Sequence, residues 1–227
     1  MCFVGDNIGM IEEKNKIIID KKAVSRRHVY HAIKRVFDFI ASLIGLIILS
    51  PVFLVVAIAI KVNDRGPVFF VQKRVGKNGR LFRMYKFRSM FIDAEARLKD
   101  LKDKNEVEGP MFKMAHDPRI TRVGRFIRKY SLDELPQLVN VLKGDMSLIG
   151  PRPALPREVA EYDDYAKQRL LVLPGCTGLW QATVRNSVGF SGMLKLDLEY
   201  IQNASVWMDL KILFLTVKVF FVPNGAH

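Results

Sequence analysis

Two adjacent carboxylates, Asp133 and Glu134, stand out in a chain dominated by Lys and Arg. The 227 residues include 36 Lys and Arg against 23 Asp and Glu, a formal net charge of +13. An acidic pair in such a basic chain suits Mg²⁺ and phosphate, because the metal can bridge carboxylate and phosphoryl oxygens. The pair lies in the segment 131–153, SLDELPQLVNVLKGDMSLIGPRP. That segment ends in a stiff Pro-Arg-Pro turn, where the guanidinium of Arg152 suits bidentate phosphate binding, although a plain structural turn is also possible.

Helix capping is the competing interpretation of the acidic pair. Ser131 and Glu134 match the S-x-x-E capping box, and Asp133 could itself be the N-cap, with Pro136 in the first turn. Helix statistics alone favour capping over catalysis. The two roles are compatible, because a helix N-terminus offers free amides and a positive dipole end to an anion. We expect this helix to end at Lys143-Gly144 and a short strand to follow at 146–149.

Further basic residues precede the acidic segment. The stretch 73–88 holds seven Lys and Arg and no acidic residue. A solvated or headgroup-binding face explains most of these charges. Two apolar runs, 67–72 and 81–87, flank a Lys-Asn-Gly turn pattern and predict a β-hairpin. Lys86 and Arg88 alternate onto one side of its second strand, which makes them candidates for binding an anion.

One segment, 36–60, is apolar and long enough to cross about 30 Å of hydrocarbon. Basic residues lie on both sides of it, so the positive-inside rule places both Lys34 and Lys61 in the cytosol. Ser50-Pro51 lies near the middle, where proline removes a backbone donor and the Ser hydroxyl can bond a freed carbonyl. We therefore expect a re-entrant helix-break-helix; a bitopic anchor with a proline kink is the alternative. Asp38 is expected to pair with the arginine three residues before it or with a neighbouring base.

The chain divides around this segment. We expect a polar, mobile arm at 1–32, the membrane hairpin at 33–62, a catalytic domain at 63–221 and a tail at 222–227. The predicted fold class is α/β and mostly helical, with a small β-hairpin sheet and amphipathic interfacial helices around a cytosolic active site. Cys2 and Cys176 are far apart in the sequence and are expected to be free and reduced. The helices predicted in the domain cover 93–103, 156–171, 193–203 and 208–221, the last either at the interface or in the core.

Five ordered motifs resemble those of the bacterial sugar transferases. These are the monotopic polyprenyl-phosphate phosphoglycosyl transferases that begin capsule, exopolysaccharide and glycoprotein glycan assembly. The resemblance runs from about Ile33 to Phe221. The motifs are the apolar hairpin with its central Ser-Pro, VQKRVGKNGRLFRMYKFRSM at 71–90, DPRITRVGRFIRKYSLDELPQLVNVLKGDMSLIGPRP at 117–153, PGCTGLWQ at 174–181 and LDLEYIQNASVWMDLKIL at 196–213.

The resemblance implies that sugar 1-phosphate passes from a UDP-sugar to undecaprenyl phosphate, which leaves UMP. In the family's two-step scheme Asp133 would be the nucleophile and carry an aspartyl-phosphosugar intermediate. Glu134 would assist as a metal ligand or acceptor-orienting base, and Mg²⁺ on Asp133 and Glu134 would be the cofactor. Four basic residues match further family positions that are implied to face nucleotide or acceptor: Lys86, Arg88, Arg152 and Arg185. Two acidic residues, Asp197 and Asp209, match positions implied to be structural or metal-supporting.

The resemblance also implies a location. The lipid phosphate lies at the membrane interface and the UDP-sugar is cytosolic, so the site must lie at the headgroup plane. We expect a monotopic protein in one leaflet of the bacterial inner membrane, with its catalytic domain on the cytoplasmic face; a homodimer is possible. The chain departs from the family at Thr183-Val184, where Asn-Gly usually precedes the arginine. A β-branched Val cannot replace Gly at positive φ, so we expect a different loop near Arg185.

Three alternatives stay open. A membrane-tethered nucleic-acid binder would explain the charge, but the sequence shows no aromatic-interleaved stacking face or recognition helix, and we expect no nucleic-acid partner. A non-catalytic scaffold would explain the hairpin and the basic face, yet it leaves Asp133, Glu134 and Arg152 without a role. Among enzymatic mechanisms, a single-step ternary displacement competes with the covalent route. The sugar also stays open, because relatives that handle different sugars share these motifs.

Overall fold

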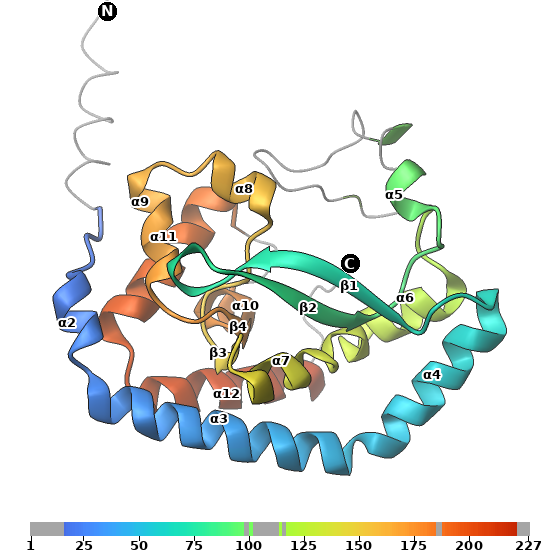
Figure 1. Ribbon diagram of the computed structural model, residues 1–227, viewed down its shortest axis with the longest axis horizontal. Coiled ribbons are helices and arrows are strands. Elements are labelled where there is room, and N and C mark those ends of the chain that lie inside the picture. The colour runs from blue at the N-terminus through green and yellow to red at the C-terminus, as the bar shows by residue number, and fades with distance from the viewer. Residues whose placement is uncertain (1–15, 98–99, 102–113, 115–116, 185–187, 222–227) are drawn as a thin grey trace, which may run out of the picture.

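Helices account for most of the described residues, which are 16–97, 100–101, 114, 117–184 and 188–221 of the computed structural model (Figure 1). Two small sheets lie among them: β1 pairs antiparallel with β2, and β3 pairs parallel with β4. This arrangement confirms the mostly helical α/β class and the predicted β-hairpin. The second sheet was not predicted: β3 matches the strand expected at 146–149, but no strand was expected at 175–177.

The elements of the fold have the following bounds. The helices are α2 (Lys21–Ser25), α3 (His28–Ile48), α4 (Ser50–Asp64), α5 (Ala94–Arg97), α6 (Arg122–Lys129), α7 (Gln137–Lys143), α8 (Pro156–Ala160), α9 (Asp164–Lys167), α10 (Leu179–Thr183), α11 (Phe190–Asn203) and α12 (Val206–Phe221). The 3₁₀ turns are η1 (Lys77–Gly79), η3 (Leu132–Glu134) and η4 (Gln168–Leu171). The strands are β1 (Phe69–Val75), β2 (Leu81–Phe87), β3 (Ser147–Ile149) and β4 (Gly175–Thr177).

The apolar segment bends where its Ser-Pro pair predicts. α3 and α4 meet at Leu49 with their axes 60° apart. Pro51 lies in the first turn of α4, where its missing N–H leaves no hydrogen bond unmade. The hydroxyl of Ser50 donates to the carbonyl of Ile47 at 2.8 Å. Within the described residues no single helix is long and apolar enough to span a membrane, whereas the bent pair passes that test jointly.

Part of the predicted N-terminal arm packs against the domain instead of moving freely. Ile19 and Val24 are buried in the largest hydrophobic cluster, and the backbone N–H of Ile19 donates to Gln168 at 2.6 Å. Asp20 caps α2 by accepting from the backbone N–H of Lys22 at 2.8 Å. The core therefore begins well before residue 33. The first fifteen residues, which include Cys2, lie outside the described residues.

α7 joins the β-hairpin to α3. The Asn140 side chain accepts from the backbone of Tyr85 at 3.0 Å and donates to the carbonyl of Arg83 at 2.7 Å, which fixes α7 against β2. On its other side α7 packs on α3, and a Cβ at Gly45 would lie only 3.3 Å from the Leu138 side chain. Glycine thus permits the close approach of the two helices.

α3 also supplies polar contacts to the domain. Arg35 donates to the carbonyls of Val141 and Leu142 at 2.6 and 2.8 Å, and so caps the C-terminal end of α7. Asp38 is buried and accepts from the backbone N–H of Leu148 at 3.1 Å. The expected pairing of Asp38 with Arg35 was therefore wrong, because each side chain satisfies a different part of the backbone.

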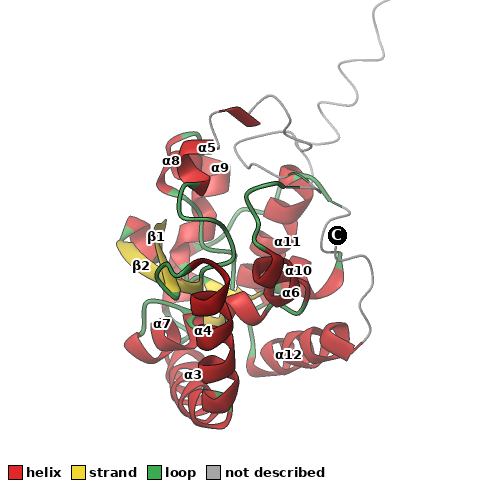
Figure 2. Ribbon diagram, turned by 90° about the vertical axis from the view of Figure 1, so that its right-hand side faces the viewer, coloured by secondary structure: helices red, strands yellow, loops and turns green. Residues whose placement is uncertain are grey.

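The C-terminal half follows the predicted helices in part. The segment 156–171 is broken into α8, α9 and η4 rather than forming one helix, with Asp163 capping α9 at 2.7 Å. α11 and α12 confirm the last two predicted helices, and Ile201 and Ile212 pack them into the largest core cluster. Of the helix predicted at 93–103 the described part includes α5; most of the remainder lies outside the described residues. α12 runs beside α3 along one edge of the molecule (Figures 1 and 2).

Candidate functional site

Both carboxylates of the acidic pair lie on the short turn η3, between α6 and α7. Ser131, which precedes the turn, has a left-handed backbone with φ 51°, and its side chain caps neither helix. α7 begins only at Gln137, after Pro136. The capping interpretation was therefore wrong: an N-cap needs an extended backbone, which Ser131 does not have. An uncommon conformation of this kind is typical of functional sites.

Glu134 is held by Lys86. The Lys86 Nζ lies 2.6 Å from Oε1 of Glu134, and the two side chains are 22% and 39% exposed. Burial alone would raise the pKa of Glu134, but Lys86, Arg152 and Arg74 hold that pKa below its ordinary value. Glu134 is therefore a carboxylate at neutral pH. The ion pair also ties the β-hairpin to the turn that carries both acids.

Asp133 is the more buried of the two acids. It is 7% exposed, and it forms no ion pair with any residue that the structure describes. Burial raises the pKa of Asp133 to about 6; Lys86 and Arg128 oppose the shift, and the charge of Glu134 adds to it. Asp133 is thus mostly ionised at neutral pH but more basic than an ordinary aspartate. Neighbouring acids whose pKa values are pushed apart are typical of catalytic sites.

Arg74 and Arg152 surround the acidic pair with positive charge. Arg152 is exposed on the loop after β3, while Arg74 is buried on β1 and donates to the carbonyl of Pro153 at 2.9 Å. Burial and, to a smaller extent, the nearby charge of Arg152 lower the pKa of Arg74 to about 10. Two cations held close together favour an anion between them. Phosphate groups, which guanidinium binds well, suit this position.

Arg74 was not predicted as a site residue, because it stood among many basic residues attributed to a solvated face. The alternation of side chains along β1 could have identified Arg74. Phe70 pairs with Lys86 in the hairpin register, and Arg74 lies four residues after Phe70, on the same face of the sheet. Arg128 was missed as well. It lies in the last turn of α6, where its charge opposes the rise in the pKa of Asp133. The sequence motif did not indicate that this residue would lie near the acidic pair.

The loop that carries Arg152 is held by close backbone contacts. The N–H of Gly175 donates to the carbonyl of Pro151 at 2.8 Å, and that of Gly150 donates to Thr177 at 2.9 Å. A Cβ on Gly175 would lie 2.1 Å from the nitrogen of Gly150, so a side chain there would force the two segments apart. The Pro-Arg-Pro turn is therefore built on a rigid base, as its sequence predicts.

Three other predicted site residues are engaged elsewhere. Arg88 is buried and pairs with Asp64 at the end of α4, with no room for a side chain at Gly66 against its guanidinium. Asp209 accepts from Lys34 and Tyr30, both at 2.9 Å, and so joins α12 to α3. Asp197 is buried against Arg169 at 2.7 Å. For both acids the observed contacts are structural, and any role in binding substrate or metal stays a prediction.

The loop expected to differ from the family lies partly outside the described residues, and Arg185 is among those left out. Val184 is described. Its φ is −101°, and its N–H donates to the carbonyl of Trp180 at 3.0 Å. A β-branched residue adopts this conformation without strain. The negative φ of Val184 agrees with the reasoning that Val cannot take a position needing positive φ, while a changed loop at Arg185 stays a prediction.

The acidic pair fits Mg²⁺ only when the metal is shared with substrate. The described residues contain no group of three or more His, Cys, Asp or Glu that could hold a metal ion. Mg²⁺ is commonly bound by one or two carboxylates together with substrate phosphates and water. Asp133 and Glu134 meet that requirement, although Lys86 already occupies one oxygen of Glu134.

Together these features suit a phosphate-bearing anion: two carboxylates lie among basic side chains, on a turn whose Leu132 packs against α4 of the bent helix pair. The chain belongs to the bacterial sugar transferase family, a model of which matches residues 29–223.

Relatives with known names agree. The chain is 50% identical over 194 residues to galactosyl transferase CpsE of Streptococcus agalactiae, covering 85% of this chain and 43% of that protein. It is 46% identical over 200 residues to undecaprenyl-phosphate galactose phosphotransferase of Salmonella typhimurium, covering 86% and 42%. The exopolysaccharide production protein ExoY of Rhizobium meliloti is 39% identical over 198 residues, covering 86% and 88%. The chain thus spans less than half of the first two relatives and most of the third.

Proposed function

We propose that this protein transfers sugar 1-phosphate from a UDP-sugar to undecaprenyl phosphate, which yields a lipid-linked diphosphosugar and UMP as the first membrane step of glycan assembly. Family membership and the names of the relatives support this reaction. Those names include galactose, glucose and N-acetylgalactosamine phosphotransferases that act with undecaprenyl phosphate. Galactose is the first sugar to test, because two of the relatives described above carry it in their names.

The observation that carries the proposal is the buried carboxylate of Asp133, which lies beside Glu134 and has no ion-pair partner among the described residues. An Oδ of Asp133 attacks the β-phosphorus of the UDP-sugar; the bond from that phosphorus to the bridging oxygen breaks, and UMP leaves. A phosphate oxygen of undecaprenyl phosphate then attacks the same phosphorus and releases Asp133 as a carboxylate. The raised pKa of Asp133 makes it a better nucleophile than an ordinary aspartate while it stays mostly ionised.

The basic residues around Asp133 stabilise the negative charge of both steps. Lys86, Arg74 and Arg152 neutralise the diphosphate and the departing UMP, and Arg128 supplies further positive charge near Asp133. Lys86 also fixes Glu134, so that of the two acids Asp133 is the one without an ion pair among the described residues. Mg²⁺ held by Asp133, Glu134 and the substrate phosphates would neutralise charge on the diphosphate.

The position of the site relative to the membrane is part of the proposal. α3 and α4 enter and leave the cytoplasmic leaflet from the same side, and α12 lies in the interface beside them. Most of the exposed large apolar side chains of the described residues are on these three helices, which supports a lipid-facing surface. The basic flanks of the helix pair favour a cytosolic location for both ends.

A UMP-release assay tests the reaction. Wild-type protein in lipid or detergent is given a panel of UDP-sugars, with and without undecaprenyl phosphate and Mg²⁺. We expect acceptor-dependent UMP release by the wild type and a loss of about 10³-fold or more in Asp133→Asn. Asp145→Asn is the matched control, since Asp145 is the next aspartate in the chain and has no part in the site. Absence of UMP with every sugar would refute the function.

Exchange of labelled UMP into UDP-sugar, measured without lipid acceptor, separates the two mechanisms. The covalent route predicts exchange in the wild type and none in Asp133→Asn. A single-step ternary displacement predicts no exchange in either protein. Unchanged turnover of Asp133→Asn would exclude the covalent intermediate.

A further inference from the structure

A buried arginine outside the acidic pair holds the loop that carries Arg152. Arg169 lies on η4 and is 4% exposed. Its Nη2 donates to the carbonyl of Arg152 at 3.3 Å and lies 2.7 Å from Oδ2 of Asp197, while its Nη1 donates to the hydroxyl of Tyr162 at 2.7 Å. One planar guanidinium thus joins the Arg152 loop to α11 and to the segment between α8 and α9.

Stability alone is a poor explanation for this arrangement. Asp197 is 1% exposed, so both charges are removed from water, and the cost of desolvation offsets most of the attraction between them. The ion pair instead fixes the orientation of the Arg169 guanidinium. A guanidinium donates in a fixed plane, so Arg169, once oriented by Asp197 and Tyr162, determines where the carbonyl of Arg152 lies.

The prolines stiffen this turn, since Pro153 also restricts the ψ of Arg152, but they do not fix where the turn lies relative to the rest of the domain. Pro151 and Pro153 have fixed φ angles, and the carbonyl of Pro153 is held by Arg74. The hydrogen bond from Arg169 holds the Arg152 end of the turn, and its loss would let the stiff turn shift as a unit and move the Arg152 side chain relative to Glu134. Arg152 is close enough to Glu134 to lower its pKa, so the direction of this side chain decides where positive charge meets the substrate.

We propose that Arg169 is a positioning residue, which acts through the backbone of Arg152 to hold the Arg152 guanidinium on the diphosphate of the nucleotide sugar. The identity of the substrate rests on the proposed function. Asp197 and Tyr162 orient Arg169, which gives Asp197 a task at a distance from the acidic pair.

A double-mutant cycle tests this coupling. Arg169→Lys keeps the charge opposite Asp197 but cannot reach three partners in one plane. We expect a rise of about tenfold in the KM for UDP-sugar, with kcat changed by less than about twofold. In an Arg152→Ala background, Arg169→Lys should produce no further rise in KM. A rise of equal size in both backgrounds would show that Arg169 acts independently of Arg152 and would overturn the proposal.

Arg27→Lys is the matched control. Arg27 also binds backbone carbonyls, those of Ile201, Gln202 and Ala204 at the end of α11, but it does not contact the Arg152 loop. Its replacement should leave the KM for UDP-sugar unchanged. If Arg169→Lys does not fold, Tyr162→Phe, which removes one of the hydrogen bonds that orient Arg169, replaces it in the cycle and should raise KM in the same direction.

Hydrogen–deuterium exchange of the peptide 150–156 provides a readout that does not depend on activity. Exchange should be faster in Arg169→Lys than in the wild type, and unchanged in Arg27→Lys. Equal exchange in all three proteins would overturn the anchoring of the loop even where turnover is normal. Failure of the wild type to release UMP would instead refute the proposed function, and the exchange result would still decide whether Arg169 holds the loop.

Discussion

Asp133 and Glu134 are neighbours in the sequence but chemically different acids. Lys86 keeps Glu134 ionised, whereas burial makes Asp133 the more basic group. A nucleophilic carboxylate benefits from this difference, because basicity and nucleophilicity increase together while the ionised form still predominates at pH 7. The proposed division of labour between the two acids therefore follows from their surroundings and not from their residue type.

The pH dependence of turnover reports on Asp133. Its pKa of about 6 predicts that kcat/KM for UMP release falls about tenfold per pH unit below pH 6, as the carboxylate becomes protonated, and levels off above it. Because Lys86 lowers this pKa, the residual activity of Lys86→Met should show its break at higher pH. A wild-type profile that stays level down to about pH 4 would contradict the assignment.

The sequence predicted the centre of the site better than its edges. Asp133, Glu134, Lys86 and Arg152 were expected together from the acidic pair and the family motifs, and the structure places Lys86 against Glu134 and the charge of Arg152 near it. Arg88 was expected to bind an anion, but it is engaged by Asp64 at the far end of α4. A pairing of that kind depends on how the apolar helices return to the β-hairpin, which local patterns do not contain.

Among the elements of the fold, α3 does more than lie beside the domain. It packs on α7, caps its C-terminal end through Arg35, and holds the start of β3 through Asp38. The break at Ser50-Pro51 could be predicted because proline chemistry is local. The parallel pairing of β3 with β4 could not, since its two short strands lie far apart in the sequence and neither has a distinctive alternation.

Cysteine labelling tests the direction in which the helix pair enters the membrane. Val29 and Lys61 are exposed near the two outer ends of the pair. In a Cys2→Ala, Cys176→Ala background, we expect Val29→Cys and Lys61→Cys to react with an impermeant maleimide only after the inner membrane is opened. Val29 replaces Lys34 as the probe, because Lys34 is paired with Asp209. Labelling of one position from the periplasm would support a bitopic anchor instead.

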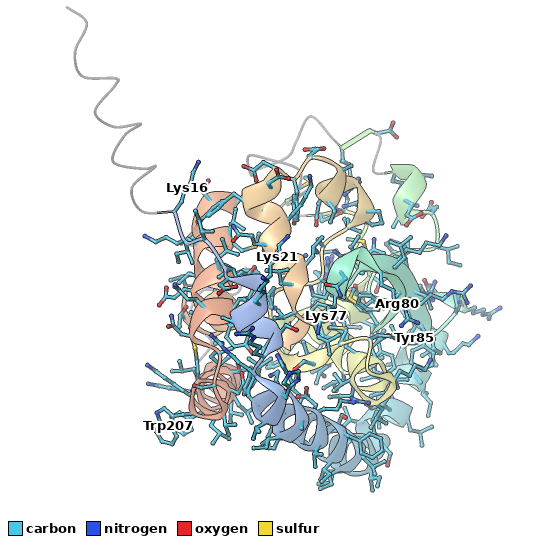
Figure 3. All side chains as sticks on the ribbon, turned by 60° about the vertical axis from the view of Figure 1, so that its left-hand side comes forward. Lys16, Lys21, Lys77, Arg80, Tyr85 and Trp207 are labelled. Atoms are coloured by element: carbon cyan, nitrogen blue, oxygen red, sulfur yellow. The ribbon has the colours of Figure 1, made fainter. Side chains whose placement is uncertain are left out.

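At the scale of the whole molecule, most of the exposed large apolar side chains of the described residues lie on α3, α4 and α12. α3 and α12 lie along the same edge in two views (Figures 1 and 2), and Trp207 projects outward from the start of α12 (Figure 3). Trp207 is 78% and Phe214 71% exposed. Side chains of this size are seldom left in water in such numbers, and tryptophan favours the membrane interface.

Replacing the two aromatic residues of α12 tests this surface. The double variant Trp207→Glu, Phe214→Glu should bind liposomes at least about tenfold more weakly, because each side chain contributes about 2 kcal/mol when removed from water. Liposome flotation gives the bound fraction. Lys195→Glu is the control, since it makes the same change of two units in net charge on an exposed position of α11 and should leave binding nearly unchanged. Equal binding by the double variant would exclude α12 from the interface.

The contacts of Arg35 and Asp38 carry a practical consequence. These two residues belong to the apolar helix, yet Arg35 caps the C-terminal end of α7 and Asp38 accepts a hydrogen bond from Leu148 in β3. A shortened chain starting after residue 64 would lose both supports and uncover the underside of α7, so trimming the helices away should not release a free-standing enzyme. A water-soluble variant is better sought by replacing the outward-facing apolar residues of α3 and α4 with polar ones while leaving the inner faces of these helices unchanged.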